Sequence, residues 1–170
     1  MSVIGERRRS TQTAEQRLHE LGISLPVAPK PLGAYVEAVQ VGSLLFLSGA
    51  LPLEGGAVKF TGRIGLEVTL QQARDATRLA TLNALALALG HLGSLDRVSR
   101  VVRLHTTLAA STEFRDHPVV ADAASELIGQ IFGPEKTSVR MVTGVSSLPL
   151  GASCVVELIL EINARGRGQK

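Results

Sequence analysis

The sequence predicts one α+β domain in which a mixed β-sheet carries two core helices on one face. Three observations support this prediction. The elements follow the order β-β-(β)-α-β-α-β-β, two long segments carry apolar residues at helical spacing, and the last segment alternates between purely apolar and mixed positions. With 170 residues and 45% hydrophobic content, the chain can bury one core without a disulfide or a metal. We expect a domain over 28–163, preceded by a tail and short peripheral helix over 1–27 and followed by a basic tail over 164–170.

The N-terminal helix is expected over residues 11–21. Thr13 stands three residues before Gln16, a spacing typical of a capping box, and Gly22 follows as a stop signal. Three prolines then exclude a helix between Gly22 and Gly33, so this segment should run extended.

The two core helices are expected over 68–92 and 117–133. The first is rich in Ala, Leu, Gln and Arg, which favour helices, and its second half is apolar on most sides. Such a helix is usually covered on two sides, here by the sheet and by a neighbouring helix or loop. The second has apolar residues at helical spacing, with Pro118 near its start and Gly133 at its end.

The strands are predicted from alternation, β-branched residues and Gly-containing turns. Their expected ranges are 35–41 and 44–48 as a hairpin, a short strand near 58–61, a long strand over 98–110, and 137–147 and 152–162 as a closing hairpin with its turn at 148–151.

The last strand predicts how the sheet is used. One side carries only Cys154, Val156, Leu158, Leu160 and Ile162, and this side should meet the helices. The other side mixes valine and isoleucine with Glu157 and Glu161. No third core helix remains to cover that side, so we expect it to meet another copy of the chain.

Charge and cysteine content narrow the function classes. The two ends carry net charges of +2 and +3 out of a total of +3, which leaves the middle of the chain at −2. A slightly acidic body with scarce aromatics argues against a nucleic-acid-binding domain. Cys154 is the only cysteine, so no intrachain disulfide is possible. There is no secretory signal pattern and no apolar run of about 18 residues, so we expect a cytoplasmic protein without a membrane span.

Arg140 is the candidate for chemistry, because metal spacing, nucleophile elbows and phosphate loops are all missing. It is a permanent cation within an apolar strand, on the same side as Val142 and Gly144. Two interpretations stay open. Arg140 could form a salt bridge with Glu157 or Glu161 on an adjoining strand, or it could grip a small carboxylate ligand, with Gly144 leaving room beside it.

Several short blocks resemble the Rid (reactive intermediate deaminase, or YjgF-like) family over about residues 28–163. These blocks are Leu32-Gly33-Ala34-Tyr35-Val36, Leu47-Ser48-Gly49, Leu82-Asn83, Leu95 to Val98, and Arg140 eight residues before Leu148-Pro149. The resemblance implies a chorismate-mutase-like trimer with clefts between subunits. It also implies hydrolysis of reactive 2-imino or enamine acids to 2-oxo acids and ammonia, with no cofactor and no metal.

By this resemblance, Arg140 would hold the substrate carboxylate, while Tyr35, Ser48, Gly49 and Asp122 would line the cleft. The family's water-orienting acid falls on Val155, so Glu157, two residues further along the same side, is the candidate for that role. Ala50, Asp122 and Val142 also differ from the residues usual in the family. A trimer that binds a carboxylate metabolite without turning it over is therefore the alternative, and a ribonuclease or translation inhibitor is the third possibility.

Overall fold

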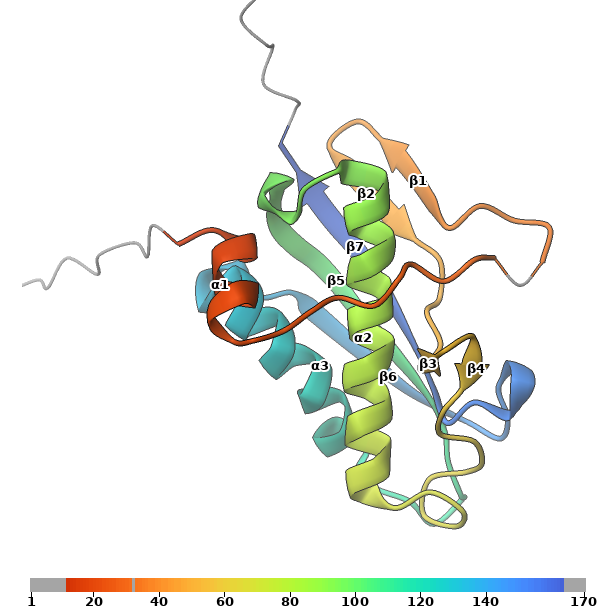
Figure 1. Ribbon diagram of the computed structural model, residues 1–170. Helices are drawn as coiled ribbons and strands as arrows, with labels where there is room; N and C mark the ends of the chain where they lie inside the picture. The colour runs from red at the N-terminus through yellow and green to blue at the C-terminus, as the bar shows by residue number, and fades with distance from the viewer. Residues whose placement is uncertain (1–11, 32, 164–170) are drawn as a thin grey trace, which may run out of the picture.

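The structure is a computed structural model and describes residues 12–31 and 33–163 (Figure 1). In chain order its elements are α1 (Ala14–Glu20), β1 (Ala38–Val41), β2 (Leu44–Leu47), β3 (Leu53–Glu54), β4 (Ala57–Val58), α2 (Leu70–Leu92), β5 (Val98–Ala109), α3 (His117–Phe132), β6 (Val139–Val145) and β7 (Cys154–Ile162). Single 3₁₀ turns lie at Leu95–Arg97, Pro134–Lys136 and Pro149–Gly151. Residues 1–11 of the segment predicted as tail and short helix over 1–27, and the predicted basic tail over 164–170, lie outside the described residues.

The main sheet has the strand order β1-β2-β7-β5-β6. β5 and β6 are parallel and are connected through α3, whereas the other neighbours are antiparallel. The predicted closing hairpin is wrong, because β5 lies between β6 and β7. The connection between these two strands is instead held against another loop, where Ala152 pairs with Thr61. The short strand expected near 58–61 is replaced by the small β3–β4 hairpin.

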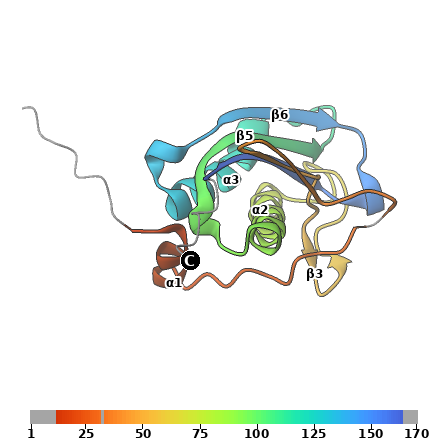
Figure 2. The same cartoon turned by 90° about the horizontal axis from the view of Figure 1, so that it is seen from above.

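Both core helices cover the same face of the sheet, as predicted (Figure 2). The five β7 residues expected to meet them are all buried at 3% exposure or less. α2 begins at a capping box formed by Thr69 and Gln72 and ends at Gly93, whose positive φ of 78° suits a residue without a Cβ. Alanines at 73, 76, 80, 84 and 88 are fully buried along α2, so small side chains let this helix lie close to the elements around it.

The N-terminal segment completes the helical layer. Thr13 and Gln16 form the predicted capping box at the start of α1, and this helix packs against α3. The extended segment over 21–31 then crosses the outer side of α2 (Figures 1 and 2). Ile23 and Leu25 from this segment pack onto the core. α2 is thus covered by the sheet on one side and by this segment and α3 on others, as its apolar second half predicted.

Candidate functional site

A pocket of about 390 Å³ lies where β2 ends and brings together three of the predicted cleft residues, Tyr35, Ser48 and Gly49. Val155 of β7 lines the same pocket. The remaining lining residues come from the N-terminal segment, the residue before β1, the stretch after β2, α2 and the 3₁₀ turn before β7. They are Pro29, Lys30, Pro31, Glu37, Ala50, Leu51, Leu53, Leu87 and Pro149.

Strand pairing holds Ser48 and Gly49 in this wall. The Ser48 backbone N–H donates to the Glu37 carbonyl at 2.8 Å, and Ala50 exchanges backbone hydrogen bonds with Val156 at 2.8 and 3.0 Å. Between them, a Cβ placed on Gly49 would lie 2.6 Å from Val155 Cγ1. Glycine is therefore required by the close approach of β7, and any side chain at this position would displace Val155 from the pocket wall.

Asn83 binds the chain segment that lines the pocket. It is buried within α2, and its Nδ2 donates to the Leu51 and Leu53 carbonyls at 2.9 and 3.0 Å. These bonds tie the stretch that lines the pocket to the helix. Sequence analysis assigned no role to this amide and used it only as part of the family resemblance. The available signal was one polar residue inside the most apolar run of the longest helix.

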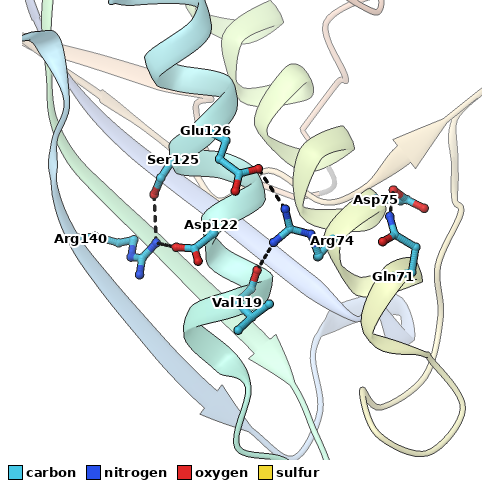
Figure 3. A network of polar contacts seen from close by, with 8 residues as sticks. All are labelled: Gln71, Arg74, Asp75, Val119, Asp122, Ser125, Glu126 and Arg140. Atoms are coloured by element: carbon cyan, nitrogen blue, oxygen red, sulfur yellow. Dashed lines mark hydrogen bonds and ion pairs between the residues drawn. The ribbon is translucent and has the colours of Figure 1, made fainter. Parts of the chain in front are cut away.

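Arg140 lies on β6, at the opposite edge of the sheet. Its Nη1 donates to Asp122 Oδ1 at 2.6 Å and to Ser125 Oγ at 3.1 Å, both on α3 (Figure 3). Of the two open interpretations, the salt bridge to Glu157 or Glu161 is wrong, because β5 separates β6 from β7. Arg140 instead faces the helices, since its register partner Leu104 is part of the core. The structure thus brings two predicted site residues, Arg140 and Asp122, into one ion pair.

The Arg140 guanidinium keeps donor capacity after this pairing. Within residues 12–31 and 33–163, its hydrogen bonds all leave from Nη1, while a guanidinium carries five N–H groups in a planar fork. The side chain is 28% exposed. The room expected beside it at Gly144 is already taken, because a Cβ there would lie 2.6 Å from His117 Nε2. Gly144 therefore admits an imidazole from the start of α3 rather than a ligand.

Glu157 lies on the helix-free face of the sheet in a different contact. Its Oε2 lies 3.0 Å from His105 Nδ1, and His105 Nε2 lies 3.0 Å from Thr143 Oγ1. The three residues span the neighbouring strands β7, β5 and β6. Glu157 does not line the 390 Å³ pocket, although it is close to Gly49. Its predicted catalytic role stays a prediction.

The predicted site is thus divided between two edges of one sheet. Three strand spacings separate β2 from β6, which amounts to about 14 Å. Tyr35, Ser48 and Gly49 therefore cannot meet a small ligand together with Arg140 of the same chain. Within the described ranges, no cluster of three or more His, Cys, Asp or Glu side chains could hold a metal ion, and none of the helices is long and apolar enough to cross a membrane.

Comparison with known proteins agrees with this architecture. Residues 15–162 match the family model described as "YjgF/chorismate mutase-like, putative endoribonuclease". The chain belongs to the YjgF/RutC (Rid) family. The fold expected from the resemblance, a chorismate-mutase-like mixed sheet with helices on one face, is confirmed.

Three relatives of this Rid-family chain illustrate the range of names. "Protein TCP17" of Trypanosoma cruzi is 37% identical over 86% of this chain and 92% of its own length. A "2-iminobutanoate/2-iminopropanoate deaminase" of Dermatophagoides farinae is 31% identical over 82% of this chain and 94% of its own. The crystal structure of a "putative endoribonuclease" from Shewanella oneidensis MR-1 has a TM-score of 0.85 and 35% identity, covering 89% of this chain and 100% of that chain.

Proposed function

We propose that this Rid-family chain forms a homotrimer that hydrolyses small 2-imino or enamine acids to 2-oxo acids and ammonia in clefts between subunits. The observation that carries the proposal is the division of the site. The pocket of Tyr35, Ser48 and Gly49 lies at one edge of the sheet, and the Arg140–Asp122 pair lies at the other. A site assembled from the pocket of one copy and the Arg140 of its neighbour would reunite them.

The chemistry suits such a cleft. An imine reacts with water unaided, so the protein mainly needs to position the substrate and orient a water molecule. The free N–H groups of Arg140 can take the substrate carboxylate as a fork. The apolar pocket around Val155 would take a short side chain. The deaminase among the relatives supports this choice of reaction.

The activity test follows the disappearance of 2-iminobutanoate generated in situ by an amino-acid oxidase. We expect the protein to accelerate its hydrolysis and Arg140→Ala to abolish the acceleration. Arg74→Ala is the matched control. Like Arg140, Arg74 pairs with an acid of α3, in its case Glu126, but it does not line the pocket (Figure 3). Equal rates with and without the wild-type protein would refute the deaminase activity.

The shared cleft is tested by complementation. Ser48→Phe should fill the pocket, and Arg140→Ala should remove the cation, so each variant alone is inactive. Random mixing of the two chains in a refolded trimer should restore about a quarter of the clefts, because a cleft needs an intact pocket from one copy and an intact Arg140 from the next. Failure to recover any activity in verified mixed trimers would show that the two halves do not meet across subunits.

One observation favours a second function, the binding of a carboxylate metabolite without turnover. Val155 stands where the resemblance expects the water-orienting acid, and it is a half-buried apolar residue of the pocket. This alternative predicts that 2-oxobutanoate raises the melting temperature of the protein, with no acceleration of imine hydrolysis. The family description and the Shewanella structure both carry the name endoribonuclease. This third possibility predicts that rigorously purified protein cleaves RNA. RNA left intact by the purified protein would exclude it.

A further inference from the structure

One carboxylate on the pocket wall has no partner in the part of the chain that the structure describes. Glu37 precedes β1, is half-buried and lines the same pocket as Ser48 and Gly49. Its side chain makes neither a hydrogen bond nor an ion pair with the described residues. A half-buried carboxylate on a pocket wall without a protein partner is available to a ligand or a water molecule in that pocket.

Strand register defines where this carboxylate points. Ala38 is the register partner of Leu47, and the Ser48 N–H donates to the Glu37 carbonyl, so Glu37 lies opposite Ser48. Ala38 packs onto the core, and alternation therefore places the Glu37 side chain on the helix-free face. Val155 is on that same face, because its neighbours in β7 are buried against the helices.

No other residue near the pocket offers an unpaired carboxylate among the described residues. Glu157 is held by His105 and does not line the pocket. Val155, at the position expected to carry the acid, has no ionisable group. Among the lining residues Glu37 is the acid and Lys30 the base, and no ion pair joins the two.

We infer that Glu37 is the catalytic base of this site, replacing the acid that Val155 lacks; this inference rests on the proposed imine hydrolysis. Glu37 takes one proton from a water molecule while the water oxygen bonds to C2 and the C=N π pair moves to nitrogen. Glu37 then returns that proton to the nitrogen of the tetrahedral intermediate. The C–N bond breaks as the hydroxyl oxygen forms the carbonyl, and the hydroxyl proton goes to the departing nitrogen, so the products are the 2-oxo acid and ammonia.

The test compares three isosteric substitutions on the helix-free face, Glu37→Gln, Glu157→Gln and Glu161→Gln. Glu161 is the matched control, because it is an exposed acid of β7 outside the pocket. We expect Glu37→Gln to lower kcat by about 100-fold or more with a nearly unchanged KM. Glu37→Asp, which keeps the carboxylate, should recover part of the rate.

Binding separates this inference from the proposed function. Stabilisation by 2-oxobutanoate should persist in Glu37→Gln and disappear in Arg140→Ala. If the wild type hydrolyses the imine and Glu37→Gln stays within about threefold of it, far short of the effect of a general base, only the Glu37 assignment is overturned. A selective loss in Glu157→Gln would then assign the role to Glu157. If the wild type itself gives no acceleration, the deaminase proposal fails and the Glu37 assignment fails with it.

Discussion

The ion pair between Arg140 and Asp122 sets the charge that the proposed carboxylate ligand would meet at the β6 edge. The guanidinium is balanced by a carboxylate 2.6 Å away, and both side chains keep some contact with solvent. A ligand carboxylate arriving at the free N–H groups therefore meets a site with no net charge. This arrangement favours recognition by hydrogen-bond geometry over simple charge attraction.

Asp122→Asn should strengthen the binding of anionic ligands. The amide oxygen can still accept from Arg140, while the repulsion between Asp122 and the ligand carboxylate is removed. We expect the Kd for 2-oxobutanoate to fall by about 3- to 10-fold, the effect of one nearby charge that is partly screened by solvent. Calorimetric titration measures this change. Glu126→Gln, which removes a charge from the same helix beside Arg74, should leave the Kd unchanged, and an unchanged Kd in Asp122→Asn would contradict the charge argument.

Cys154 gives the structure a defined response to pH. It is buried in β7, and desolvation raises the pKa of its thiol to about 12 from an ordinary value of 9.0. The folded state therefore keeps the proton that the unfolded chain loses above pH 9, so this contribution to stability is complete below pH 9 and is lost as the pH rises from 9 to 12. We expect a thiol reagent at pH 8 to label Cys154 only after denaturation. Rapid labelling of the native protein would show that the thiol is accessible.

Among the elements, α2 does more than cover the sheet, because it also anchors the pocket wall. Its buried alanines lie along one helix that packs against α3 and β7. The side-chain amide of Asn83, which lies among these apolar residues, donates to the backbone carbonyls of Leu51 and Leu53. The shape of the pocket is thus coupled to the position of this core helix.

Asn83→Ala should destabilise the protein by about 1–3 kcal/mol, because two backbone carbonyls lose their donor at a buried position. Urea unfolding measures the free energy. Gln71→Ala on the same helix is the control, since Gln71 makes an exposed bond to Asp75 and should cost about 0.5 kcal/mol or less (Figure 3). Equal losses in the two variants would show that the buried amide adds nothing beyond helix propensity.

At the scale of the whole molecule, none of the residues that the structure describes forms a layer over one face of the sheet. Strand register places several exposed large apolar residues on this face, which points away from the helices. They are Val39, Val41, Phe46, Val139 and Met141. The same face carries the His105–Glu157 contact. A surface that combines apolar residues from both edges with satisfied polar groups between them is typical of a subunit interface.

Met141→Lys should convert the proposed trimer into monomers, because an ammonium would be buried without a partner at that interface. Light scattering should give three times the 17.9 kDa chain mass for the wild type and one chain mass for the variant. Leu66→Lys, at an exposed apolar residue outside the strands, is the control and should leave the mass unchanged. A monomeric wild type would overturn the shared cleft.

Local sequence determined the elements of this protein, and only the tertiary structure decided which of them meet. The alternation of β7, the capping box at Thr13 and the apolar second half of α2 each act within a few residues, so helices, strands and the buried face could be predicted. The partner of Arg140, the imidazole beside Gly144 and the separation of β6 from β7 depend on contacts between distant segments. Periodicity contains no information on strand order, because the backbone N–H and C=O groups along a strand edge can pair with those of any neighbouring strand.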